Sequence, residues 1–96
     1  MKSVLRLYEK KIFSNGCVLE MRLWEITKNN RYPEGIKYNL IFICSSGNRK
    51  VLMDNHSPKG HHYHLDYDQF EYLYQGIPQL LEDFKFLVKK HTGVNL

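Results

Sequence analysis

Two apolar runs set between turn signals constrain the fold of this chain most strongly. Within residues 17–26, side chains of Leu19, Met21 and Leu23 alternate with those of Glu20, Arg22 and Trp24, as in a strand with one buried side. Residues 36–44 also alternate and become apolar on both sides toward their end, which indicates a central strand. The pair Asn15-Gly16 just before the first run is the strongest short signal for a hairpin, because both residues tolerate positive φ. The sequence therefore predicts antiparallel strands in chain order.

Three further segments are expected to extend the sheet. Residues 4–13 form a mixed run that ends at the first turn, and residues 49–54 return as a strand after the second expected turn. Residues 61–67 are predicted to follow as an edge strand. Two tight turns and one polar loop connect these strands: Ser57 to Gly60, Ser45 to Asn48, and Thr27 to Gly35.

The periodicity changes near the C-terminus. From Ile77 to Val88 apolar residues recur every three or four positions, which predicts an amphipathic helix with Pro78 in its first turn. Thr92-Gly93 is expected to end it. The predicted fold is α+β: a single antiparallel sheet of about four to six strands in meander order, with one C-terminal amphipathic helix packed on one face. Residues 1–96 are expected to form one domain.

Composition indicates the class of partner and the cellular compartment, but it says little about the function. The net charge of +4 and pI near 9.1 favour an acidic partner, either nucleic acid or an acidic protein, but only weakly. No window approaches the roughly 20 apolar residues of a membrane-spanning helix, so we expect a cytoplasmic protein without membrane contact. Cys17 and Cys44 lie inside apolar runs and are read as buried thiols of a reducing compartment, although neighbouring strands would also allow a bridge.

The segment from Asp54 to His64 holds four of the five histidines. Histidine both gives and accepts protons near neutrality, because its unperturbed pKa is about 6.5. On an extended strand His62 and His64 point to one side and His61 to the other. The Cα atoms of alternate residues are roughly 6.6–6.8 Å apart. Two imidazoles at that spacing are able to straddle one phosphodiester.

This spacing predicts a metal-independent endoribonuclease. One of His62 and His64 would take the 2′-hydroxyl proton of RNA, and the other would protonate the leaving 5′-oxygen. Lys59, or amides of the Gly60 turn, would stabilise charge on the phosphate, and Asp54 would orient a histidine. The predicted catalytic residues are thus His62, His64, Lys59 and Asp54.

Two other readings of the segment stay open. Histidines on an edge strand also serve as solvated polar residues that discourage pairing with other sheets. A metal site is the other reading, because His62, His64, Asp66 and Asp68 share one parity. Four ligands on one straight strand cannot converge tetrahedrally, and no CxxC or HExxH pattern is present. We therefore expect no metal and no other cofactor.

The chain resembles the TumE family of small toxins from bacterial toxin–antitoxin operons. Three strands carry the first part of the resemblance, namely VLEMRLWEI (18–26), IKYNLIFI (36–43) and RKVLMDN (49–55). The most diagnostic part is the run from Lys59 to His64, which is similar to the family's Lys-Gly-x-His-x-His. The last part is Tyr72-x-Tyr74 followed by LLEDF (80–84), where the family more often has Phe in place of Tyr74.

The resemblance implies a growth-inhibiting toxin encoded beside an antitoxin that often carries a DNA-binding helix-turn-helix. By position it carries over Asp54, Lys59, His62 and His64 from the residues discussed above. It also carries over Tyr38, Asn55 and Gly60. We expect these three residues, together with the neighbouring His61, to bind substrate. RNA as the substrate rests on residue chemistry and on analogy with other small toxins, because the resemblance itself does not define the target.

The alternative function is a non-catalytic module that inhibits a protein or nucleic-acid target by occupying it. Such a binder has no need of two titratable histidines on one side of a strand. The side of the sheet away from the helix carries Glu20, Arg22 and Trp24 and is only partly polar. It is therefore expected to dock the antitoxin or a second copy of the chain, which would make a homodimer.

Overall fold

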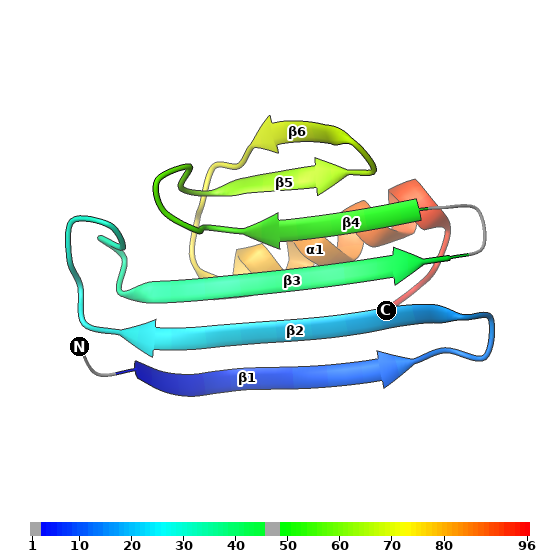
Figure 1. The fold of residues 1–96 in the computed structure, drawn as a ribbon, viewed down its shortest axis with the longest axis horizontal. Helices are drawn as coiled ribbons and strands as arrows, with labels where there is room; N and C mark the ends of the chain where they lie inside the picture. The colour runs from blue at the N-terminus through cyan, green and yellow to red at the C-terminus, as the bar shows by residue number, and fades with distance from the viewer. Residues whose placement is uncertain (1–2, 46–48) are drawn as a thin grey trace.

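A computed structural model describes residues 3–45 and 49–96. In these residues the chain forms one antiparallel sheet of six strands in sequence order, with a single helix across one face (Figure 1). The expected α+β meander is confirmed. The elements are β1 (Ser3–Ile12), β2 (Cys17–Ile26), β3 (Ile36–Cys44), β4 (Arg49–Asp54), β5 (His62–Leu65), β6 (Asp68–Glu71) and α1 (Ile77–Thr92). The expected turn at 45–48 falls largely on residues 46–48, which lie outside the described part.

Alternating apolar residues build the core on the helix side of the sheet. Every second residue of β2, β3 and β4 is buried there, and α1 adds one buried residue per turn. The fully covered side chains at the centre are Leu40, Phe42, Val51, Met53, Leu80, Phe84 and Val88. The other side of the sheet carries no helix and faces the viewer in Figure 1. We call it the open face.

Residues 62–71 form a hairpin of two strands, whereas residues 61–67 were expected to form a single edge strand. β5 ends at Leu65, and Asp66 turns the chain with a φ of 56°, a value that Asp tolerates better than most residues. The backbone amide of Asp66 donates to the Lys50 carbonyl, and its carboxylate accepts from the Lys50 amide, both at 2.9 Å. β6 then pairs with β5, so β5 has a neighbour on each side.

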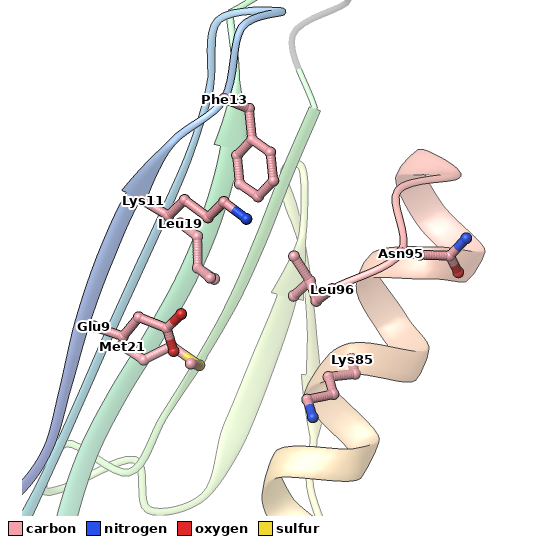
Figure 2. A pocket seen from close by; sticks show the side chains of 8 residues that line it. All are labelled: Glu9, Lys11, Phe13, Leu19, Met21, Lys85, Asn95 and Leu96. Carbon is pink, nitrogen blue, oxygen red and sulfur yellow. The ribbon is translucent and has the colours of Figure 1, made fainter.

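The helix covers the sheet unevenly. It packs against β4 and leaves β1 exposed along nearly its whole length. A pocket of about 200 Å³ remains between β1, β2 and the C-terminal part of the chain (Figure 2). Phe13, Leu19 and Met21 reach into it from the sheet side, and Leu96 faces them from the C-terminal segment. No helix in the described ranges is both long and apolar enough to cross a membrane.

The two cysteines form a disulfide, so their reading as free buried thiols was wrong. Cys17 begins β2 and Cys44 ends β3, and the antiparallel register places them directly opposite each other. Both side chains point to the helix side, where they are buried. The register between two strands decides this pairing, and the separation of 27 residues in the chain does not reveal it.

Reduction of this bridge should lower the free energy of unfolding by about 2–4 kcal/mol, because the cross-link restricts the unfolded chain. Urea unfolding of the wild-type protein with and without a thiol reductant measures the difference. The double variant Cys17→Ser/Cys44→Ser is the control, since reductant should leave its unfolding midpoint unchanged. Equal midpoints for oxidised and reduced wild type would show that the strand ladder holds β2 and β3 without help.

Candidate functional site

Strand register assembles polar residues into rows on the open face. One row runs across β3, β4 and β5 through Asn39, Asp54 and His62. The next row contains His64, which lies opposite Leu52 of β4. Because cross-strand partners share a face of the sheet, His62 and His64 project together from the open face, and His61 projects toward the helix side.

A pocket of about 240 Å³ lies where β4 ends and β5 begins, against the turn that joins them. In Figure 1 this turn is at the left end of the sheet. The structure brings all four residues that were predicted to be catalytic into the pocket lining. Its lining residues are Asp54, His56, Ser57, Pro58, Lys59, His62 and His64.

His62 forms the buried floor of this pocket, with only 5% of its surface exposed. Its Nδ1 lies 2.8 Å from the Gly60 carbonyl, and its Nε2 lies 3.2 Å from Oδ1 of Asp54. Both partners are acceptors, so a neutral ring can donate only one of these hydrogen bonds. The imidazolium form donates both. The two contacts together hold the His62 ring in one fixed orientation.

His64 lies beside His62 in a different environment. The two ring centroids are 5.0 Å apart and the rings are nearly perpendicular, at 76°. Within the described residues, nothing is hydrogen-bonded to the His64 ring. Partial burial lowers the pKa of His64, and the positive charges of His62 and Lys50 lower it further. His64 thus combines an unbonded ring with a preference for the neutral form.

Asp54, Lys59 and Gly60 complete the pocket in different ways. The Oδ1 atom of Asp54 accepts a hydrogen bond from the His56 amide at 3.1 Å, which fixes the carboxylate beside His62. Lys59 is exposed at the rim, where its Nζ donates to Gln69 of β6 at 3.2 Å. Gly60 has a φ of 72°, a value that favours glycine, and it contributes its carbonyl to His62.

Asn55, a predicted substrate-binding residue, is buried outside this pocket. Its Oδ1 accepts from the Tyr38 amide at 3.0 Å, and its Nδ2 donates to the Ile36 carbonyl at 2.9 Å. The side chain thereby continues the pairing of β4 with β3 beyond Asp54. This arrangement gives Asn55 a positioning role at the mouth of the pocket.

His61 and Tyr38, also predicted to bind substrate, lie together on the helix side. The His61 Nδ1 is 2.8 Å from the Tyr38 hydroxyl, and its Nε2 is 3.1 Å from Oε1 of Glu34. The ring also stacks on Tyr74 at a centroid distance of 4.6 Å. Burial raises the pKa of Tyr38, so its hydroxyl stays protonated. Sequence reasoning missed Glu34, because nothing in the polar loop 27–35 marks it as a partner of His61.

The metal reading finds no support in this geometry. Among the described residues, no group of three or more His, Cys, Asp or Glu side chains is placed to hold a metal ion. Asp66, which sequence parity placed with His62 and His64, instead turns toward Lys50 and toward Nε2 of His91, 2.9 Å away. The strand ends before Asp66, so parity no longer applies there.

Replacement of Asn55 by alanine should destabilise the fold. It leaves the Tyr38 amide and the Ile36 carbonyl buried without partners, at a cost of about 1–3 kcal/mol each. Asn39→Ala, on the exposed open face of β3, is the matched control and should change stability little. Urea unfolding without any RNA measures both variants. If Asn55→Ala is as stable as wild type, the residue has no positioning role.

The family comparison agrees with the motifs and the geometry. The family model described as toxin TumE matches residues 2–91, which is nearly the whole chain. No curated protein and no solved structure gives a match. The match includes all six strands, the pocket and most of α1. The chain therefore belongs to the TumE family of toxins, which act in toxin–antitoxin pairs and so have an antitoxin as partner.

Proposed function

We propose that this toxin is a metal-independent endoribonuclease in which His64 is the base and His62 is the acid. The observation that carries the proposal is the contrast between the two adjacent rings. His62 is held by two acceptors in a way that suits its protonated form. His64 has no hydrogen-bond partner among the residues that the structure describes, and it favours its neutral form. A base and an acid side by side are what cleavage of an RNA phosphodiester by its own 2′-hydroxyl requires.

In the proposed reaction His64 removes the proton from the 2′-hydroxyl, and the 2′-oxygen attacks the adjacent phosphorus. The bond between phosphorus and the 5′-oxygen breaks, and that oxygen takes the Nε2 proton of His62, which in the free protein is directed at Asp54. The products are a 2′,3′-cyclic phosphate and a 5′-hydroxyl. The ring separation of 5.0 Å suits this geometry, because the attacking and leaving oxygens lie on opposite sides of one phosphorus.

The other pocket residues have supporting roles in this scheme. Asp54 holds His62 in its orientation through the contact of 3.2 Å with Nε2. Lys59 leaves Gln69 and places its ammonium against the phosphate oxygens. Gly60 fixes His62 through its carbonyl. Asn55, Tyr38 and His61 act from the helix side by holding the turn that carries Lys59.

We also propose that the antitoxin covers the pocket on the open face and carries a helix-turn-helix. A homodimer would use the exposed β1 edge, where Val4, Leu5, Tyr8 and Ile12 leave large apolar surfaces uncovered. The toxin would act in the cytoplasm, where its RNA substrate lies. Because Cys17 and Cys44 form a disulfide, free thiols no longer support this location.

The second candidate function is inhibition by occupancy. One observation favours it, namely that both nitrogens of His62 already have partners inside the protein. A histidine committed in this way also serves as a structural link between β4 and the turn. In this case Lys59 and the open face would bind the target, and no bond would be broken.

Single alanine variants of the two histidines separate these functions. His64→Ala should reduce the rate of RNA cleavage roughly 10²–10⁴-fold, the usual contribution of a well-placed general base, and His62→Ala should reduce it similarly. The matched control is His56→Ala, which removes an exposed histidine from the same pocket and should retain cleavage. In the assay, each purified protein is incubated with mixed RNA, in one set of tubes with a chelator and in a second set without it. Intact RNA with wild type, or undiminished cleavage by a folded His64→Ala protein, contradicts the mechanism.

The pH dependence of cleavage should report the state of His64. The base is active only when neutral, and burial with positive neighbours lowers its pKa below the ordinary 6.5. The rate should therefore hold as pH falls to 6.5 and decline only at lower pH, as the ring takes up a proton. Lys50→Gln removes one of the positive neighbours and should shift this decline toward higher pH. A decline centred above 6.5 in wild type would rule out His64 as the base. The measurement is kcat/KM against pH.

A further inference from the structure

We infer that a subsite for stacking a nucleobase lies next to the histidine pocket and is formed by Trp24, Tyr32 and Lys37. This inference rests on the proposed function for its substrate class, single-stranded RNA. The subsite is a separate pocket of about 350 Å³, lined by Ser3, Trp24, Ile26, Tyr32 and Lys37. None of its lining residues belongs to the histidine pocket.

The strand register places this subsite on the open face with the histidines. Trp24 of β2 lies opposite Lys37 of β3. Two residues before Trp24 on the same side of β2 is Arg22, which lies opposite Asn39 and so begins the row that leads to Asp54 and His62. From the spacing of strands and residues, the Cα of Lys37 is about 8 Å and that of Trp24 about 12 Å from that of Asp54. Neighbouring nucleotides of a strand held at the histidines reach this far.

A shared wall connects the two pockets. The Tyr32 hydroxyl accepts a hydrogen bond of 3.3 Å from the Ser57 amide, and Ser57 lines the histidine pocket. Tyr32 is 8% exposed, so its ring is a fixed boundary of the subsite. The loop 27–35 and the turn after β4 lie at the same end of the sheet (Figure 1).

The chemistry of the subsite suits a base with its phosphate. Trp24 is half-buried, so its indole is held while part of it stays accessible. An aromatic platform beside a basic side chain is the arrangement that binds single-stranded nucleic acid, because every base has a face that stacks. The Lys37 ammonium, 5.9 Å from the Tyr32 ring centroid, is exposed and able to meet a phosphate.

Trp24 is the only tryptophan in the chain, so its fluorescence reports the subsite directly. The probe is a short single-stranded RNA methylated at every 2′-oxygen, which lacks the attacking hydroxyl and cannot be cleaved. Its titration into wild-type protein should quench Trp24. An abasic oligonucleotide of the same length and charge should bind more weakly and leave the fluorescence nearly unchanged.

Variants extend the test with a labelled form of the same RNA, read by fluorescence anisotropy. Trp24→Leu should weaken binding about tenfold, and Trp24→Phe should restore part of the loss because a smaller ring still stacks. Lys37→Gln should weaken binding of the abasic and the complete oligonucleotide by the same factor. Equal affinity of Trp24→Leu and wild type overturns the subsite.

The outcomes for the subsite and for the catalytic proposal are distinguishable. Quenching that persists in His64→Ala, with no cleavage of ordinary RNA by wild type, supports the subsite and overturns the nuclease. Cleavage of ordinary RNA without quenching by the methylated probe overturns the subsite alone. If RNA leaves Trp24 unchanged while the purified antitoxin quenches it, the open face there is a protein-docking surface and the inference fails.

Discussion

The antiparallel register between β4 and β5 is the constraint on which the rest of the structure depends. It places Asp54 opposite His62, and a slip of one residue would turn every side chain of β5 to the other face. Apolar packing holds this register from the helix side, where Met53 lies opposite Tyr63 and both contact the core. The apolar residues that hold this register therefore also decide to which face of the sheet the histidines project. Stability and chemistry are coupled through the alternation of a single short strand.

At the end of the sheet that holds the histidine pocket, the two faces have different roles. On the helix side, Asn55 continues the strand pairing, and His61 is fixed between Glu34, Tyr38 and Tyr74. These contacts hold the turn between β4 and β5 from beneath. The pocket on the open face consequently has a rigid floor at His62, while the ring of His64 makes no hydrogen bond within residues 3–45 and 49–96. Adjacent histidines acquire different chemistry from their different partners, although they lie in almost the same position along the chain.

Sequence patterns predicted the parts of this arrangement that depend on local periodicity. The alternation in β2 and β3 defined both strands to the residue, and parity placed His62 and His64 on one face with His61 on the other. What could not be predicted depends on contacts between distant segments. The Cys17–Cys44 bridge follows from the register of two strands, and the hairpin after Leu65 follows from the tie between Asp66 and Lys50. No sequence pattern indicates the contact of Glu34 with His61 or the hydrogen bond from the Ser57 amide to the Tyr32 hydroxyl. Loop residues acquire such partners only once the sheet has formed.

The chemical form of the RNA ends tests the account most directly, because it reports which oxygen attacked the phosphorus. RNA incubated with purified toxin in the presence of chelator is analysed by mass spectrometry of the fragments. Attack by the internal 2′-hydroxyl, assisted by two histidines, predicts fragments with a 2′,3′-cyclic phosphate at one end and a 5′-hydroxyl at the other. Fragments with 3′-hydroxyl and 5′-phosphate ends would show attack by water and would contradict the account.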